Sequence, residues 1–146
     1  MIAIAWTVFA ILAALAALHA AWAFRVRWPA RDERSLTALV VGQTGLTRMP
    51  SRIACLVASA AILIAGLVAL ALAWPIDIHV AAAAITAIGF LVTGVFAMRG
   101  AAAYMPAWRR RFSQEPFATL DQRCYGPLCL LLAAAFAVLT LRRMVS

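Results

Sequence analysis

Residues 53–74 read IACLVASAAILIAGLVALALAW and residues 78–98 read IHVAAAAITAIGFLVTGVFAM, and only Pro75-Ile76-Asp77 separates them. Neither run contains an Asp, Glu, Lys or Arg. Each is long enough to cross the hydrocarbon layer of a membrane, which needs roughly 20 apolar residues at a helical rise of about 1.5 Å. Because the link is so short, we expect the two runs to form an antiparallel helical hairpin.

Two further apolar runs flank this hairpin. Residues 2–24 contain no formal charge, and residues 125–141 form a shorter run that ends at Arg142-Arg143. We interpret the first run as a retained span rather than a signal peptide, because it lacks a basic leader and its apolar part is too long. The runs lack the alternation of a β-barrel. They predict one all-α membrane domain over residues 1–146, with four transmembrane helices in an up-down bundle.

The composition supports this class of protein. Of 146 residues, 66% are hydrophobic and 12% are charged, and the mean hydropathy is +0.97. A soluble domain is about half apolar and about a quarter charged, and disordered chains have low hydrophobicity. Both of those classes are therefore excluded.

The 13 basic residues are all arginines, and their placement is one-sided. The loops after the first and third runs together carry Arg25, Arg27, Arg31, Arg34, Arg48, Arg52, Arg99, Arg109, Arg110, Arg111 and Arg123. The opposite side has only Arg142 and Arg143. Because cytoplasmic loops are enriched in basic residues, we expect both Arg-rich loops in the cytoplasm and both termini in the periplasm. The chain is then a multi-pass protein of the bacterial inner membrane.

Small residues mark possible seams between the helices, because close helix contacts in lipid favour them. The candidate seams are Ala13/Ala17, Ala54/Ala58, Ala65/Ala69/Ala73 and Thr86/Gly89/Thr93. Alanine is common throughout the chain, so the same spacing also arises from composition alone.

Each cytoplasmic loop contains a short helical pattern. In the first loop, Ser35 is the expected cap of a helix that runs through Val41 and stops at Gly42. In the second loop, residues 104–112 place four apolar side chains on one helical face beside a basic cluster, a pattern typical of a helix at lipid headgroups. The expected headgroup contacts are Trp108, Arg109, Arg110 and Arg111. The alternative is that these arginines only set the topology. No nucleic-acid recognition fold surrounds them.

Polar side chains gather at one predicted membrane depth, where the helices meet the cytoplasm. They are His19, Trp22, Arg99, Asp121 and Tyr125. Asp121 is placed to pair with Arg99 or Arg123. A His within a membrane helix is a functional candidate, so the cluster could form a pocket for a headgroup or a small anion. It could equally be a structural plug of ion pairs and hydrogen bonds that fixes how the fourth helix enters the bilayer.

Several kinds of chemistry find no support in the sequence. His19 and His79 are expected at opposite membrane faces, which excludes haem held by both. The three cysteines form no C-x-x-C pair and match no zinc pattern. None of the five acidic residues lies in a span, so a proton-coupled exporter lacks its main component. No G-x-S-x-G, H-E-x-x-H or glycine-rich phosphate loop occurs. We expect no cofactor and no metal.

The residues at this rim resemble a known pattern. His19-x-x-Trp22, Arg99-Gly100, Pro116-Phe117-Ala118-x-x-x-Asp121 and Tyr125-x-Pro127-Leu128-Cys129-Leu130 are similar to the uncharacterised bacterial family catalogued as domain of unknown function 3995. Where this chain has Gly126, the family usually has Ser, and a family Gly after the first-span Trp is absent here. The resemblance implies four helices in the inner membrane and implies no activity.

Three functions remain open. The first is a non-catalytic membrane protein, either an accessory subunit of a larger complex or a binder of anionic lipid or a small lipophile at the cytoplasmic mouth. The second is a small enzyme acting on a lipid or quinone-like substrate, with His19 as acid/base and Arg99 holding an anion. The third is transport by a homo-oligomer.

Overall fold

The computed structural model of the chain describes residues 1–75 and 79–145, and the described residues contain helices and no strand. Four helices are long: α1 (Ile2–Ala23), α3 (Arg52–Ala73), α4 (His79–Ala102) and α7 (Gly126–Met144). Four are short: α2 (Glu33–Val40), α5 (Pro106–Arg111), α6 (Phe117–Leu120) and the π-helical turn η1 (Asp121–Tyr125). Most of the predicted link Pro75-Ile76-Asp77, and the predicted start of the third span at residue 78, lie outside the described residues.

Within the described residues, four helical segments are long and apolar enough to cross a membrane. The predicted count of four spans is therefore confirmed, and the chain is an all-helical multi-pass membrane protein. Two helical segments extend beyond the predicted spans. The third helix does not stop at Met98 but continues to Ala102, and the fourth segment runs from Phe117 to Met144 rather than from 125 to 141. Arg99 lies within α4 and forms an ion pair with Asp121.

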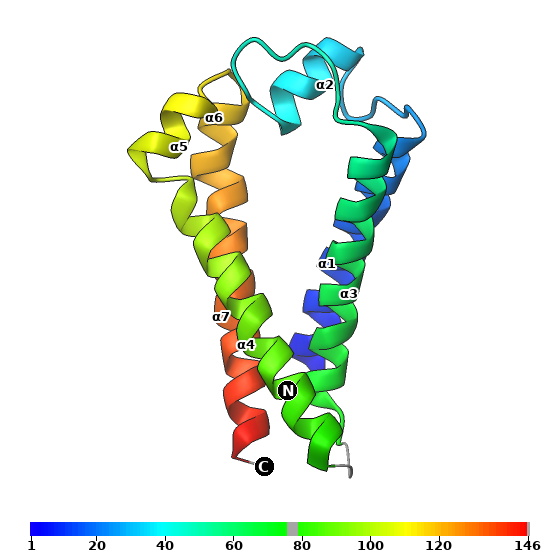
Figure 1. Ribbon diagram of the computed structural model, residues 1–146, viewed down its shortest axis with the longest axis vertical. Coiled ribbons are helices and arrows are strands. Elements are labelled where there is room, and N and C mark those ends of the chain that lie inside the picture. The colour runs from blue at the N-terminus through cyan, green and yellow to red at the C-terminus, as the bar shows by residue number, and fades with distance from the viewer. Residues whose placement is uncertain (76–78, 146) are drawn as a thin grey trace.

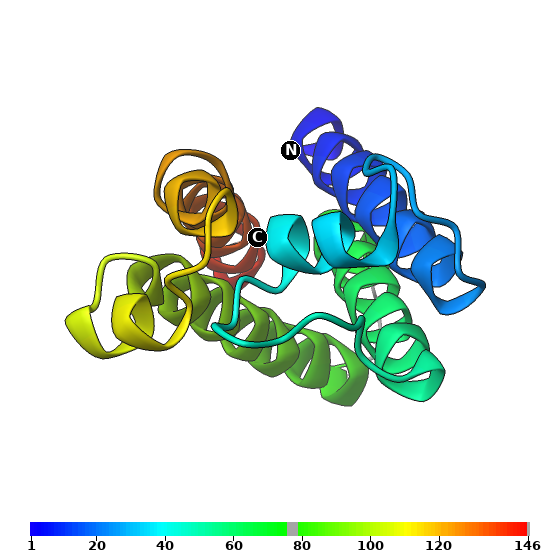
Figure 2. The same cartoon turned by 90° about the horizontal axis from the view of Figure 1, so that it is seen from above.

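Successive long helices run in opposite directions, so the predicted up-down order is present (Figure 1). They form two pairs, in which α1 lies along α3 and α4 lies along α7 (Figures 1 and 2). The pairs meet at the end that holds both termini, here called the terminal end. They separate toward the end that holds α2, α5 and α6, here called the loop end, where α2 lies between them (Figure 2).

Apolar side chains hold the two pairs together toward the terminal end. The buried cluster consists of Ala5, Val8, Leu12, Ala65, Ala69, Leu72, Leu132, Phe136 and Leu139. Within the second pair, Phe96 of α4 stacks on Phe136 of α7 with ring centroids 5.7 Å apart, and so packs against this cluster. In lipid, such contacts stabilise the bundle by close packing rather than by removal of apolar surface from water. The remaining apolar surface of the long helices suits a lipid environment.

Glycines let α4 and α7 approach closely near the loop end. A Cβ on Gly126 would lie 2.8 Å from Ala103 Cβ and 2.8 Å from the Asp121 carbonyl oxygen. A Cβ on Gly100 would lie 2.7 Å from Leu130 Cγ. A larger residue at Gly126 would require the backbone to shift, whereas at Gly100 the Leu130 side chain would have to move.

Helix α2 of the first loop packs across the loop end of the bundle (Figure 2). Helix α2 is capped by Asp32, whose Oδ1 accepts from the Ser35 backbone N–H at 2.8 Å. The predicted Ser35 cap was wrong, because a carboxylate three residues before that N–H is the stronger acceptor. The predicted stop at Gly42 is confirmed, since its φ of 66° is left-handed. The Phe117 ring packs over Gly42, where an added Cβ would overlap it.

An arginine ties the two helix pairs together at the terminal end. Arg143 of α7 donates to the carbonyl oxygens of Ala71 at 3.1 Å and Trp74 at 2.7 Å. These carbonyls belong to the last turn of α3, which carries a partial negative charge. Arg143 therefore caps α3 as well as ending α7.

Candidate functional site

The polar contacts of the loop end centre on Asp121, the first residue of η1. Arg99 Nη2 lies 2.6 Å from Asp121 Oδ1, so the end of α4 is joined to the start of the fourth apolar segment. Asp121 is only 2% exposed, whereas the Arg99 side chain is 32% exposed. The structure thus brings together two of the predicted site residues, and it pairs Asp121 with Arg99 rather than with Arg123.

Trp108 of α5 completes the surroundings of this carboxylate. Its indole Nε1 donates to Asp121 Oδ2 at 2.9 Å, and the Arg99 guanidinium lies 5.0 Å from the centre of a Trp108 ring. Both oxygens of Asp121 therefore have a donor, as a buried carboxylate requires. Trp108 was expected among headgroup contacts, but its only polar atom is directed at Asp121.

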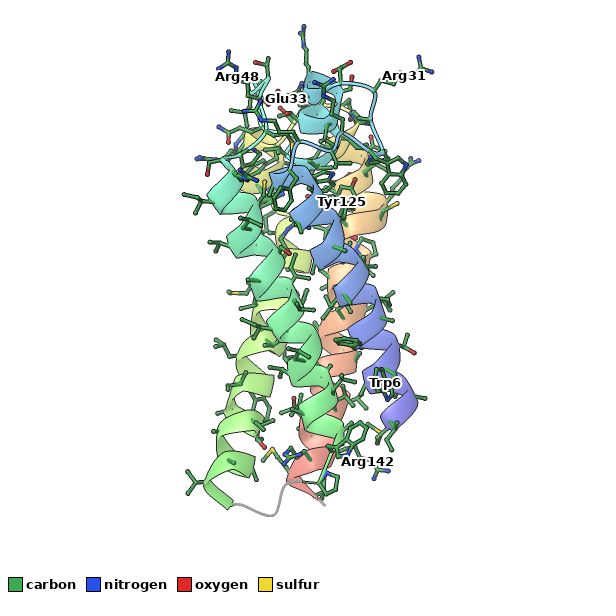
Figure 3. The ribbon with its side chains drawn as sticks, turned by 90° about the vertical axis from the view of Figure 1, so that its right-hand side faces the viewer. Trp6, Arg31, Glu33, Arg48, Tyr125 and Arg142 are labelled. Carbon is green, nitrogen blue, oxygen red and sulfur yellow. The ribbon has the colours of Figure 1, made fainter. Side chains whose placement is uncertain are left out.

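Tyr125 lies at the end of the same π-helical turn and faces the first loop. Its hydroxyl donates to the Leu39 carbonyl oxygen at 3.2 Å, and its ring packs against Phe117 at 5.8 Å between centroids. The turn closes with the Gly126 N–H donating to the Asp121 carbonyl oxygen. Asp121 and Tyr125 thus hold α5 and α2, respectively, against the start of the last span (Figure 3 labels Tyr125).

His19 and Trp22 lie on α1, which belongs to the other helix pair. The His19 ring contacts Trp22 at 4.9 Å between centroids, and its Nδ1 lies 2.8 Å from the Leu15 carbonyl oxygen. Trp22 Nε1 donates to the Trp28 carbonyl oxygen at 2.9 Å. Among the contacts of residues 1–75 and 79–145, none joins these two side chains to Arg99 or Asp121. The five predicted residues therefore fall into two groups.

The basic cluster of the second loop is on helix α5, which is shorter than expected. The helix begins at Pro106, not at residue 104, because Pro has no N–H to donate and is favoured in the first turn. Arg109, Arg110 and Arg111 are exposed in its last turn. With the Gln122 amide oriented so that its oxygen faces Arg109, this oxygen accepts a hydrogen bond from Arg109 Nε at 2.7 Å.

A cavity of about 610 Å³ lies beside α5. The polar and charged lining residues include Trp108, Arg109, Arg110, Ser113, Glu115 and Asp121, and Tyr104 and Phe112 add aromatic rings. Aromatic faces and guanidinium groups are suited to an amphiphile with a negative headgroup. The helical spacing of residues 104–112 predicted Trp108 on an apolar face at the lipid headgroups, and it gave no indication that the indole donates to Asp121.

The described residues offer little for covalent or metal chemistry. No three His, Cys, Asp or Glu side chains gather there as a metal site would require. The three cysteines are unpaired, and they lie on separate segments of the loop-end half. The groups present can bind and orient an anion.

The family comparison agrees with the resemblance found in the sequence. The family model described as "Protein of unknown function (DUF3995)" matches residues 12–136. This range contains the Arg99–Asp121 pair, α5 and both loops. Comparison with curated proteins and with solved structures gives no match.

Proposed function

The chain belongs to the DUF3995 family of proteins of unknown function, and from this starting point we propose that it is a non-catalytic inner-membrane protein whose loop end binds anionic lipid. In this proposal the loop end lies at the cytoplasmic leaflet. Both Arg-rich loops lie at that one end of the bundle (Figure 1). The positive-inside rule therefore applies to the two loops together.

One observation carries the proposal: the buried carboxylate of the loop end is already neutralised from within. Asp121 is paired with Arg99 and hydrogen-bonded by Trp108. The exposed arginines of α5 therefore keep their positive charge toward the surroundings. Near an anionic leaflet each such arginine is worth about 1 kcal/mol.

The two alternatives lack a comparable observation. An enzyme using His19 with Arg99 needs these groups near one substrate, whereas they lie on different helix pairs and have separate partners. Transport by a homo-oligomer needs a polar path, whereas the described core of each copy near the terminal end consists of Ala, Val, Leu and Phe. A role as an accessory subunit of a larger membrane complex is compatible with this proposal, because the same chain can bind lipid and a partner protein.

The test measures which lipids stay on the purified protein. The wild-type chain is extracted from nanodiscs containing equal amounts of phosphatidylglycerol and phosphatidylcholine, and retained lipids are counted by native mass spectrometry. We expect selective retention of phosphatidylglycerol. The variant Arg109→Gln/Arg110→Gln/Arg111→Gln should lose this selectivity by about tenfold to a hundredfold.

The control removes three exposed arginines elsewhere, Arg31→Gln/Arg34→Gln/Arg142→Gln, and therefore has the same net charge. It should retain phosphatidylglycerol as the wild type does. Equal losses in the two triple variants would mean that only net charge matters, and the α5 surface would then not be a binding site.

A further inference from the structure

A second cavity at the loop end lies where α1 ends and α3 begins. Its volume is about 470 Å³, within the range of small-molecule sites. The last turn of α1, the connection to α2, the start of α2 and the residues before α3 form its wall. Trp22 belongs to this wall, whereas no residue of α5 does. The cavity is therefore separate from the α5 surface.

The wall of this cavity is rich in arginine. It includes Arg25, Arg27, Arg48 and Arg52, and its acidic member is Glu33. Glu33 Oε1 accepts from the Met49 backbone N–H at 3.1 Å, which partly satisfies that carboxylate. Figure 3 shows Glu33 and Arg48 at the loop end, and both residues line the cavity. The wall carries a net positive charge that an anion would balance.

The backbone around the cavity adds to the positive electrostatic potential of the wall. Ser51 caps α3, because its hydroxyl oxygen accepts from the Ala54 N–H at 3.2 Å. The N–H groups of Arg52 and Ile53 are in the first turn of the helix, where no carbonyl of the same helix can accept from them. Pro50, Ser51 and Arg52 line the cavity, so the positive end of a 22-residue helix borders it. Free N–H groups and the dipole at a helix N-terminus favour phosphate.

One of the arginines contacts an aromatic ring, and another lies at a left-handed backbone turn. The Arg52 guanidinium lies 4.7 Å from the centre of the Phe24 ring, a cation–π contact. Arg25 has a φ of 63°, a left-handed conformation that costs a non-glycine residue about 1 kcal/mol or more. This conformation turns the chain sharply after α1. Side chains fixed before binding lose less entropy when a ligand arrives.

The rest of the wall is apolar. Trp22, Val26, Leu36 and Met49 contribute to it, and Leu36 is 2% exposed. A wall that combines guanidinium groups with apolar side chains fits an amphiphile better than a bare inorganic ion. We propose that this cavity binds a phosphate-bearing ligand, with the phosphate on Arg25, Arg27, Arg52 and the start of α3. The shared chemistry is a phosphate ester, either in a lipid headgroup or free in solution.

The experiment uses the full chain and two probes. Retention of phosphatidylglycerol is measured by native mass spectrometry, and binding of glycerol 3-phosphate in detergent is measured by calorimetry. The variant Arg25→Gln/Arg52→Gln should weaken binding of at least one probe by about tenfold or more, because two charge-assisted contacts are lost. The control Arg31→Gln/Arg34→Gln removes two arginines of the same loop that do not line the cavity and should change binding less than about twofold.

A third variant removes space instead of charge. Val26→Trp fills the cavity while every arginine remains, and it should also lose the probe. This variant decides the result if Arg25→Gln/Arg52→Gln fails to fold, as judged by circular dichroism and gel filtration. Unchanged binding in a folded Val26→Trp protein would overturn the proposal, as would equal effects of the two double variants.

The two probes identify the source of the phosphate. A loss confined to phosphatidylglycerol assigns the cavity to a lipid headgroup, and a loss of glycerol 3-phosphate binding assigns it to a soluble ester. The cavity proposal and the proposed function can be tested separately. If the α5 triple variant loses phosphatidylglycerol and the cavity variants keep both probes, the cavity proposal is wrong and the α5 surface stands.

Discussion

Arg99 and Asp121 are 22 positions apart in the chain and form an ion pair of 2.6 Å that joins the end of α4 to the start of η1. The two partners differ in their access to solvent. Asp121 is 2% exposed and has a second donor in Trp108, whereas the Arg99 side chain is 32% exposed. Removal of one partner therefore has a different cost from removal of the other.

We expect Arg99→Ala to be the more destabilising of the two single substitutions. It leaves a buried carboxylate with one neutral donor, which should cost about 3 kcal/mol. Asp121→Ala leaves an arginine that can reach water along its flexible stem, which should cost about 1 kcal/mol. The free energy of unfolding from SDS titration in mixed micelles checks this order. If Asp121→Ala lost as much free energy of unfolding as Arg99→Ala, or more, the burial of Asp121 would not be what makes the ion pair important for stability.

Gly126→Ala should separate α4 from α7. The new Cβ would lie 2.8 Å from Ala103 Cβ and from the Asp121 carbonyl oxygen, so we expect a loss of about 1–3 kcal/mol. Gly94→Ala is the matched control, because a Cβ there would meet no atom within 4 Å, and it should be neutral or slightly stabilising. Unfolding of both variants under the same conditions is the measurement. A cost at Gly94 as large as at Gly126 would contradict close packing as the cause.

Arg143→Ala should loosen the terminal end, because it removes the donors to the carbonyl groups of Ala71 and Trp74. Loss of a helix C-cap of this kind costs about 1 kcal/mol. Arg142→Ala removes an exposed neighbour and should stay within about 0.5 kcal/mol of the wild type. Hydrogen exchange of the last turn of α3 should rise in the first variant only. If exchange rises equally in both, Arg143 does not act as a cap.

The cap of α2 should depend on pH. Hydrogen bonds from the Ser35 N–H and hydroxyl lower the pKa of Asp32 below its ordinary value of 3.8. The carboxylate therefore stabilises α2 fully above pH 3.8, and this contribution is lost as the pH falls through the lowered pKa. In NMR titrations the Ser35 amide should shift only in this acidic range, and in Asp32→Asn it should not titrate. A midpoint above 3.8 would contradict the cap.

The apolar runs predicted the spans because absence of charge over 20 residues has few other causes. The ends of the helices were less predictable. A charged residue such as Arg99 was used to end the third span, because the sequence did not decide whether Asp121 pairs with Arg99 or with Arg123. Among the candidate seams, Ala65 and Ala69 lie in the buried core, whereas Ala17 and Ala54 are exposed. Alanine spacing gives no information on which face of a helix another helix will cover.

The candidate sites were only partly predictable, because they depend on loops. The depth of each residue in the membrane predicted that Arg99 and Asp121 would meet. It also grouped His19 with them, but depth does not reveal that α1 pairs with α3 while α4 pairs with α7. The arginine-lined cavity depends on the turn at Arg25 and on the approach of residues 48–52, and no local period encodes either.

Placement of the loop end at the cytoplasmic leaflet is tested most directly by labelling single cysteines in intact cells. In a chain with Cys55, Cys124 and Cys129 replaced by Ala, Arg110→Cys and Arg142→Cys are compared using a maleimide that cannot cross the inner membrane. We expect residue 142 to be labelled from outside that membrane and residue 110 to be labelled only after permeabilisation. Labelling of residue 110 in intact cells, with residue 142 protected, would contradict the proposed orientation.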